Sequence, residues 1–206
     1  MPKGTFFNLS GEKRERVLGA ALTEFASHSF HQATVDRIVE RAKISKGSFY
    51  QYFADKKDLY RYLVKMSQEK KLDYMKRILE EEDNPDIFSQ LRGLYAAGVR
   101  FAQDNPLLLA IGQNLLKEEE EFRREVLDQA LPEAKDFLED MLKKGLEAGE
   151  IDPKCNLSIA ASLIASFNLT LIDLLLQSSI EEGMHQFLSK TDDMIYILRH
   201  GLGKIR

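Results

Sequence analysis

The sequence predicts an all-α protein of about nine helices. Apolar residues recur at intervals of three and four along most of the 206 residues, which is the period of an amphipathic helix. Only 5 prolines and 12 glycines are present, and clusters such as the residues 104–106 and 149–153 mark the breaks between helices. No stretch shows the alternation of a half-buried strand. We expect an N-terminal three-helix unit followed by a larger helical bundle.

Three short helices are expected at the start of the chain. The first follows Ser10, an N-cap residue type, and places Val17, Ala21 and Phe25 on one face. Thr34 can cap the second and Ser45 the third, with a tight connection between them. These helices are predicted over 11–28, 35–42 and 46–53.

The rest of the chain predicts longer helices. Asp55 and Asp58 are spaced as in a capping box at the start of the fourth helix, and Pro85 ends that region. The eighth helix is the most hydrophobic, which predicts burial on more than one side. The predicted ranges are 55–81, 86–103, 106–117, 119–148 with a division near Pro132, 156–179 and 181–202.

Composition and charge favour a folded protein with a basic head. Hydrophobic residues make up 44% and charged residues 30% of the chain. Residues 1–63 hold 11 Lys/Arg and 7 Asp/Glu, whereas the remaining residues hold 18 and 26, so a net charge of +4 precedes one of −8. This asymmetry is typical of a nucleic-acid-binding module joined to a non-binding domain. The single cysteine, Cys155, suits a reducing compartment, and we expect a cytoplasmic protein with no signal peptide and no membrane partner.

The second and third helices have the layout of a helix-turn-helix. The third helix begins Ser45-Lys46-Gly47-Ser48, whose small and polar side chains would let its start enter a DNA major groove. Phe49 and Phe53 lie four residues apart and are expected to anchor the helix to the core. Tyr50, Gln51 and Tyr52 carry hydrogen-bonding groups that can contact adenine or phosphate.

The stretch 30–59, FHQATVDRIVERAKISKGSFYQYFADKKDL, resembles the DNA-binding signature of the TetR family of transcriptional regulators. The order and spacing of more than a dozen positions agree. One departure is Lys43, where the family usually has glycine at the turn. If that position has positive φ, lysine costs roughly 1 kcal/mol relative to glycine.

The resemblance implies a homodimer, formed through the last two helices, that binds double-stranded operator DNA and responds to a small-molecule effector. It implies a helix-turn-helix domain over 1–54, a connecting helix over 55–82 and a ligand-sensing and dimerisation domain over 83–206. In the last helix, Phe187, Ile195, Ile197 and Leu198 could pack against a partner copy. The expected DNA-binding residues are Thr34, Ser45, Lys46, Gly47, Ser48, Tyr50, Gln51, Tyr52 and Lys56, with phosphate contacts from Thr34, the two tyrosines and Lys56.

The ligand site is less clearly marked in the sequence. The hydrophobic character of the larger domain favours an apolar or amphipathic effector, with no cofactor, no metal and no catalytic residue. The candidate lining residues are Tyr95, Phe101, Asn114, Met141, Phe167, Asn168 and Asp173.

Three alternatives to a small-molecule-responsive repressor remain. An enzyme is disfavoured, since no catalytic motif or paired-cysteine site is present and the four histidines are scattered, with His28 and His31 expected to be structural. A helical interaction protein without DNA would be expected to have a neutral third helix. A TetR-like activator, or a regulator controlled by a protein partner, fits the same sequence.

Overall fold

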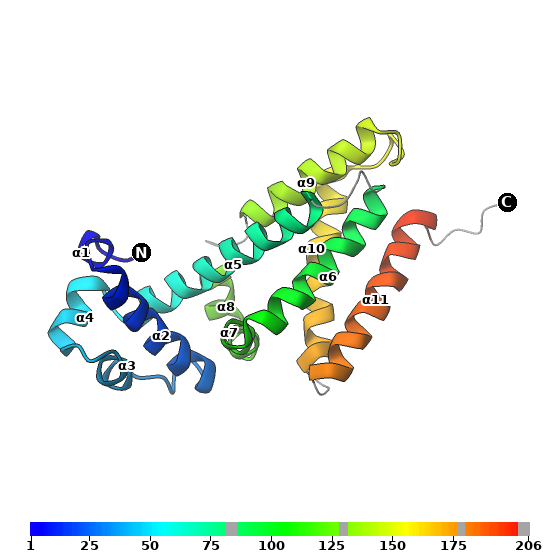
Figure 1. The fold of residues 1–206 in the computed structure, drawn as a ribbon. Helices are drawn as coiled ribbons and strands as arrows, with labels where there is room; N and C mark the ends of the chain where they lie inside the picture. Colours follow the sequence, from blue (N-terminus) through cyan, green and yellow to red (C-terminus); the bar gives the residue numbers. More distant parts are fainter. Residues whose placement is uncertain (81–85, 128–131, 177–179, 202–206) are drawn as a thin grey trace. The chain divides into compact units, whose positions relative to one another are not determined.

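The computed structural model describes residues 1–80, 86–127, 132–176 and 180–201, and every regular element in these ranges is a helix (Figure 1). The all-α prediction is confirmed, with eleven helices in the described ranges instead of about nine. One addition is α1 (Gly4–Phe7), which is too short to show a helical period in the sequence. The other arises because the predicted helix 119–148 forms two helices, the second beginning at Pro132. Within the same ranges, no helix combines the length and the apolar character that a membrane crossing requires.

The chain divides into two compact units, each built from two separate parts of the sequence. The first comprises Met1–Lys70 and Ala102–Ala130, and the second comprises Lys71–Phe101 and Leu131–Arg206. Two helices, α5 (Lys56–Glu80) and α6 (Ile87–Asp104), each begin in one unit and end in the other. The other helices of the first unit are α1, α2 (Gly11–Ser27), α3 (Val35–Ala42), α4 (Lys46–Tyr52), α7 (Pro106–Leu116) and α8 (Glu120–Leu127), and those of the second are α9 (Pro132–Glu147), α10 (Leu157–Leu176) and α11 (Ile180–His200).

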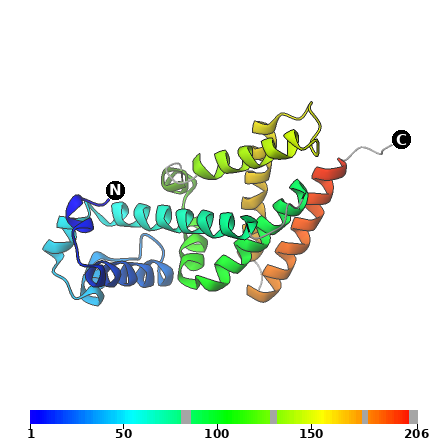
Figure 2. The ribbon, with the colours of Figure 1, turned by 45° about the horizontal axis from the view of Figure 1, so that its top comes forward.

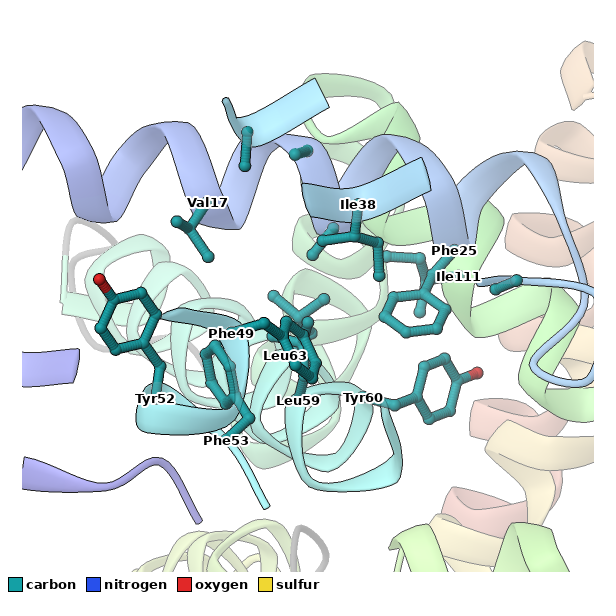
Figure 3. Close-up of a cluster of buried hydrophobic side chains, with 14 of the residues drawn as sticks. Val17, Phe25, Ile38, Phe49, Tyr52, Phe53, Leu59, Tyr60, Leu63 and Ile111 are labelled. Carbon is teal, nitrogen blue, oxygen red and sulfur yellow. The ribbon is translucent and has the colours of Figure 1, made fainter. Parts of the chain in front are cut away.

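A continuous apolar core fills the first unit, in which α2, α3 and α4 gather around the beginning of α5 (Figure 2). Phe25 of α2, Ile38 of α3 and Phe49 of α4 are fully buried and converge on Leu59 of α5 (Figure 3). Each such side chain contributes roughly 1.5–3 kcal/mol on burial. Ile111 of α7 belongs to the same core, so the core of this unit is not confined to the N-terminal helices α1–α4 and the start of α5.

In the second unit, α6, α9, α10 and α11 pack against one another through their apolar faces. Leu94 of α6, Leu142 of α9 and Ile164 of α10 are buried there. Gly145 allows the closest approach, since a Cβ at this position would lie 2.9 Å from the side chain of Ile87. Only glycine therefore fits the contact between α9 and α6 without a shift of one helix.

The helix boundaries follow local signals in the sequence. Pro106 occupies the first turn of α7, where its missing N–H has no partner to lose. Gly149 follows the end of α9 and has a φ of 76°, a left-handed conformation that favours glycine. At the start of α5, Asp55 accepts a hydrogen bond from the N–H of Asp58 at 2.7 Å, and Asp58 accepts one from the N–H of Ala54 at 3.0 Å. The predicted breaks at 104–106 and 149–153 and the cap of α5 are confirmed, whereas Pro85 lies outside the described residues.

Candidate nucleic-acid interface

The turn between α3 and α4 is closed by backbone hydrogen bonds. The N–H of Lys43 donates to the carbonyl of Glu40 at 3.1 Å, and the N–H of Ile44 donates to that of Val39 at 3.0 Å. This pair of bonds is a Schellman motif, which needs one left-handed residue. Lys43 takes that role with φ 53° and ψ 50°, and no other described non-glycine residue has positive φ. The turn expected from the sequence therefore forms with lysine in the strained position.

Side-chain caps fix the beginnings of both helices. The Thr34 hydroxyl accepts a hydrogen bond from the N–H of Arg37 at 3.3 Å, and the Ser45 hydroxyl accepts one from the N–H of Ser48 at 3.0 Å. The hydroxyls of Ser45 and Ser48 are also 2.9 Å apart. Because these caps satisfy N–H groups at the helix start, α4 begins at a defined residue. Both predicted caps are confirmed.

One face of α4 is exposed and polar, and the other is buried. Phe49 and Phe53 are fully buried, as expected for core anchors. Tyr52 is only 5% exposed, its ring lies 6.3 Å from that of Phe6, and the Lys13 ammonium lies over it. Little of this side chain is therefore exposed for its predicted contact with phosphate. The candidates on the exposed face are Ser45, Lys46, Gly47, Tyr50 and Gln51, with Ser48 half-buried.

Lys46 lies next to an acid of the preceding helix. Its ammonium is 2.7 Å from the carboxylate of Asp36, and both side chains are largely exposed. The hydrogen bond to Asp36, together with the charge of that carboxylate, raises the pKa of the Lys46 ammonium. A cation therefore stands at the open start of α4 at any physiological pH.

Lys56 is more deeply placed than the sequence suggests. Its ammonium donates to the carbonyls of Phe30 at 2.5 Å and Ala33 at 2.7 Å, and it lies 4.4 Å from the centre of the Phe30 ring. Burial lowers the pKa of this ammonium, although the charges of Glu118 and Glu24 oppose that effect. Lys56 thus ties the start of α5 to the loop before α3.

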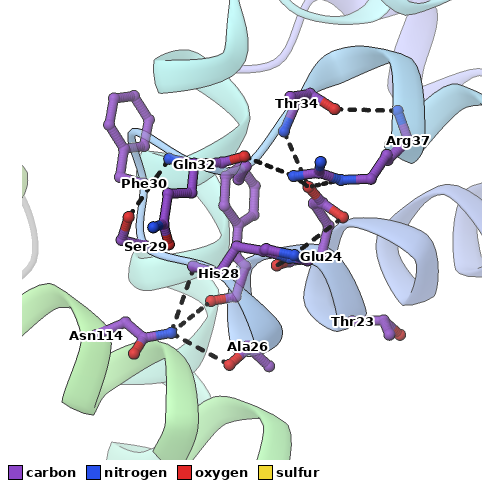
Figure 4. A network of polar contacts seen from close by, with 12 residues as sticks. Thr23, Glu24, Ala26, His28, Ser29, Phe30, Gln32, Thr34, Arg37 and Asn114 are labelled. Atoms are coloured by element: carbon purple, nitrogen blue, oxygen red, sulfur yellow. Dashed lines mark hydrogen bonds and ion pairs between the residues drawn. The ribbon is translucent and has the colours of Figure 1, made fainter.

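A buried carboxylate organises the same loop, and Figure 4 shows the network around it. Glu24 of α2 is 1% exposed and accepts hydrogen bonds from the N–H of Thr34 at 2.9 Å and from Nε of Arg37 at 2.7 Å. Burial acts to raise the pKa of Glu24, but the bonds from Arg37 and Thr34 and the positive charge of Arg37 outweigh it and lower this pKa. Glu24 therefore joins α2 to the start of α3 as an ionised group.

The two histidines of this loop also lie near carboxylates. A nitrogen of His28 is 3.7 Å from Glu24, and one of His31 is 3.5 Å from Glu118. Within the described ranges, no three His, Cys, Asp or Glu side chains are grouped to hold a metal ion.

The expected ligand residues are distributed over both units. Tyr95, Phe101 and Met141 are buried in the second unit, where the Tyr95 hydroxyl donates to the carbonyl of Ile164 at 3.2 Å. Burial raises the pKa of that hydroxyl. Phe167 is half-buried on α10. The side chains of Asn168 and Asp173 lie outside the described residues.

Asn114 belongs to the first unit instead. Its side-chain amide donates to the carbonyls of Phe25 at 3.0 Å and Ala26 at 3.2 Å, at the end of α2 (Figure 4). A cavity of about 210 Å³ in the second unit is lined by other residues: Ile87, Phe88, Leu91, Leu142, Glu150, Ile151, Asp152, Cys155, Ala160, Ile164, Leu198 and Arg199.

Sequence reasoning missed the contribution of the N-terminal segment. Phe6 of α1 is fully buried against Phe53, with ring centres 4.9 Å apart, and Lys3 and Thr5 donate hydrogen bonds to carbonyls of α4. The only signal was the pair Phe6-Phe7 ahead of the first long helix, which is too short to show a period.

Comparisons with known proteins find similarity to transcriptional regulators. The sequence model described as "Bacterial regulatory proteins, tetR family" matches residues 17–63, the region that contains α3 and α4. The chain is 24% identical over 155 residues to the fatty acid metabolism regulator protein of Bacillus subtilis (strain 168), covering 74% of this chain and 77% of that protein. It is also 24% identical to the HTH-type transcriptional regulator YdgC of the same organism, covering 93% of each chain.

Solved structures extend the similarity to the whole fold. A TetR family transcriptional regulator from Chloroflexus aurantiacus is 29% identical, covers 98% of each chain and gives a TM-score of 0.64. FadR of Bacillus subtilis, solved in complex with stearoyl-CoA, gives a TM-score of 0.71 at 18% identity, covering 92% of this chain and 99% of that one, and so shares the fold. With the helix-turn-helix geometry of α3 and α4, these findings show that residues 17–63 match the tetR family of bacterial regulatory proteins and that the chain is similar over most of its length to transcriptional regulators.

Proposed function

We propose that the protein is a ligand-responsive repressor that binds a palindromic operator as a homodimer and is released by a small apolar or amphipathic effector. The observation that carries this proposal is the exposed, polar start of α4, fixed by the Ser45 cap and by the Schellman turn at Lys43. We assign DNA binding to 1–54, connection to 55–82, and ligand sensing and dimerisation to 83–206.

On α4, the proposed reading of bases rests on side chains that are already exposed. Gln51 can make a bidentate contact with adenine, and Gly47 lets the backbone come close to the groove wall. The start of α4 also carries Ser45 and Ser48, while Lys46 supplies positive charge toward phosphate. In the absence of DNA, Asp36 is the partner of that lysine.

Phosphate contacts are proposed at the edges of the same surface, from Thr34, Tyr50, Tyr52 and Lys56. Tyr50 is 45% exposed, which supports its role. An ammonium group has three N–H donors, and Lys56 uses two on the carbonyls of Phe30 and Ala33. The third is the one that we propose for phosphate.

Exposed apolar side chains support a homodimer through α10 and α11. Ile159 and Leu163, one turn apart on α10, are 59% and 62% exposed, and Tyr196 and Ile197 of α11 are 65% and 45% exposed. Large apolar side chains in such a group are characteristic of an interface. Phe187 does not contribute, because it is 6% exposed and packs against Tyr95 within the chain.

We propose a fatty acyl-CoA or a related acyl compound as the first effector class to test. The similarity to the Bacillus subtilis fatty acid metabolism regulator and to the fold of the stearoyl-CoA complex supports this choice. Tyr95, Phe101, Met141 and Phe167 are proposed to line the site, together with Asn168 and Asp173. The amide of Asn114, in contrast, is committed to the end of α2.

The proposed mechanism uses α5 as the moving part, because this helix belongs to both units. In the dimer, the two α4 helices would lie about one DNA turn apart, roughly 34–36 Å. An effector that displaces α5 would change this spacing. A coupling of roughly 1–3 kcal/mol would lower operator affinity about 5- to 150-fold.

Selection of bound sequences from a random DNA pool tests the proposal. We expect a palindrome, and a mobility shift with that palindrome should weaken when a long-chain acyl-CoA is added.

Two variants test the residues of α4. Gln51→Ala should relax base preference. Lys46→Ala should weaken binding to all sequences and reduce the slope of log affinity against log salt concentration by about 1. A protein that selects no sequence would contradict DNA reading. Tighter binding with effector would indicate an activator, and operator binding unmoved by any acyl compound would favour a protein partner.

A further inference from the structure

The N-terminal segment closes the end of the recognition helix. α4 has only seven residues, so its last carbonyl groups cannot be satisfied within the helix. The backbone N–H of Lys3 donates to the carbonyl of Tyr52 at 2.8 Å, and the ammonium of the same residue donates to the carbonyl of Tyr50 at 2.8 Å. The Thr5 hydroxyl donates to the carbonyl of Gln51. Three consecutive carbonyl groups of α4 are therefore capped by two residues from the other end of the domain sequence.

A buried aromatic ring holds these donors in place. Phe6 is fully buried, with its ring centre 4.9 Å from that of Phe53 and 5.7 Å from that of Tyr62. The segment is thus anchored between α4 and α5, and its donors stay opposite the carbonyls. Burying such a ring is among the larger single contributions to a small core.

The residues after α4 do not supply this cap. Phe53 donates its N–H to the carbonyl of Phe49, but its own backbone is extended, with φ −129° and ψ 148°, so the chain turns away toward α5. The carbonyl groups of Tyr50, Gln51 and Tyr52 consequently take these hydrogen bonds from Lys3 and Thr5.

We propose that Lys3, Thr5 and Phe6 are positioning residues for base recognition, because they hold the end of α4 that presents Tyr50 and Gln51 to DNA. This inference rests on the proposed function of α4 as the recognition helix. Positioned in this way, Gln51 meets one base pair with a fixed geometry, whereas a frayed helix would still attract phosphate charge without telling bases apart.

The first test compares Thr5→Val with Thr23→Val. Both changes remove a hydroxyl that donates to a backbone carbonyl, but Thr23 bonds Gly19 within α2 and does not touch α4. Hydrogen exchange of the free protein should accelerate at the Tyr52 and Phe53 amides in Thr5→Val only. Affinity for the selected operator should fall about 2- to 10-fold, the effect of one hydrogen bond, with non-operator DNA changed less than about 2-fold.

The second test uses Lys3→Met, which keeps the backbone donor and removes the ammonium. We expect reduced operator affinity with an unchanged dependence on salt. A fall of about 1 in the salt slope would show that Lys3 neutralises a phosphate, and would overturn its positioning role.

The outcomes separate this inference from the proposed function. If exchange and operator affinity in Thr5→Val both match Thr23→Val, the inference is wrong while the repressor proposal stands. If the parent protein selects no DNA sequence, the proposed function fails and the role in base recognition fails with it, and the exchange measurement still decides whether the segment caps α4.

Discussion

Nε of Arg37 donates a hydrogen bond of 2.7 Å to Oε1 of Glu24, a residue that is 1% exposed. The pair joins α2 to α3 at the point where the loop between them ends. The same carboxylate accepts the N–H of Thr34, so it also fixes the residue that caps α3. One ionised side chain thus links α2 to the first turn of α3.

Glu24→Gln should lower the free energy of unfolding by about 1–3 kcal/mol, because an amide replaces the charged acceptor of Arg37. The pKa of Glu24 is lowered in the folded protein, so its contribution is fully present above its usual pKa of 4.5 and is lost as pH falls through the folded value. Urea unfolding of both proteins at several pH values measures the difference, which should shrink below pH 4.5. Glu15→Gln, at an exposed position of α2, is the control and should leave stability unchanged.

Lys43→Gly should raise the free energy of unfolding by up to about 1 kcal/mol, because glycine accepts the left-handed backbone that lysine holds at φ 53°. Thermal unfolding gives the comparison. Lys43→Ala should match the parent, since alanine also has a Cβ. A glycine variant no more stable than the alanine variant would show that the turn stores no such strain.

Asn114→Ala should destabilise the protein by about 1–2 kcal/mol, since the carbonyls of Phe25 and Ala26 would lose their donor. Asn114→Asp should be worse, because a carboxylate would face carbonyl oxygens at the negative end of α2. Gln113→Ala serves as the neighbouring control. Effector affinity, measured by calorimetry once an effector is identified, should be the same in Asn114→Ala as in the parent; a large loss would return Asn114 to the ligand site.

Gly145→Ala should cost about 1–3 kcal/mol, because its Cβ would lie 2.9 Å from the Ile87 side chain. Gly112→Ala is the matched control in a helix with open space around the position, and it should stabilise by up to about 1 kcal/mol through helix propensity. Denaturant unfolding of the three proteins decides between them. Equal effects at both positions would contradict the close approach of α9 and α6.

Leu163→Glu should convert the proposed dimer to a monomer, because a carboxylate would be buried against the partner copy. Sedimentation velocity over a range of concentrations measures the change, and Leu163→Ala should give an intermediate dissociation constant. Gln103→Glu, at an exposed position of α6 that is not among the proposed interface residues, adds the same charge and should leave the proposed dimer intact. A dimeric Leu163→Glu protein would place the interface elsewhere.

Local patterns allowed most of the fold to be predicted. Thr34 and Ser45 allowed two helix starts to be predicted, because a cap bonds the N–H only three residues further along the chain. The spacing of Phe49 and Phe53 predicted the buried face of α4. The start of α9 at Pro132 was predictable because proline is favoured at the first position of a helix.

Contacts between distant polar groups and backbone carbonyls were not predictable. Lys56 was expected to contact phosphate, and its bond to the carbonyl of Phe30 was not foreseen. Asn114 was expected to contact ligand, and its bond to the carbonyl of Phe25 was not foreseen. A carbonyl acceptor is present at every residue, so its choice of partner leaves no pattern in the sequence. For the same reason the bond from Lys3 to Tyr50 appeared only in the structure.

The first unit is built from two separate segments of the sequence, which limits how domains of this protein could be exchanged with those of another. Ile111 and Leu115 of α7 and Val126 of α8 complete a core begun by α2, α3 and α4. A chimaera that took only residues 1–70 would leave the aromatic rings of Phe25 and Tyr60 facing water unless the new body supplied a matching helix pair. A functional exchange of DNA specificity must therefore either transplant two segments together or confine itself to the surface of α4.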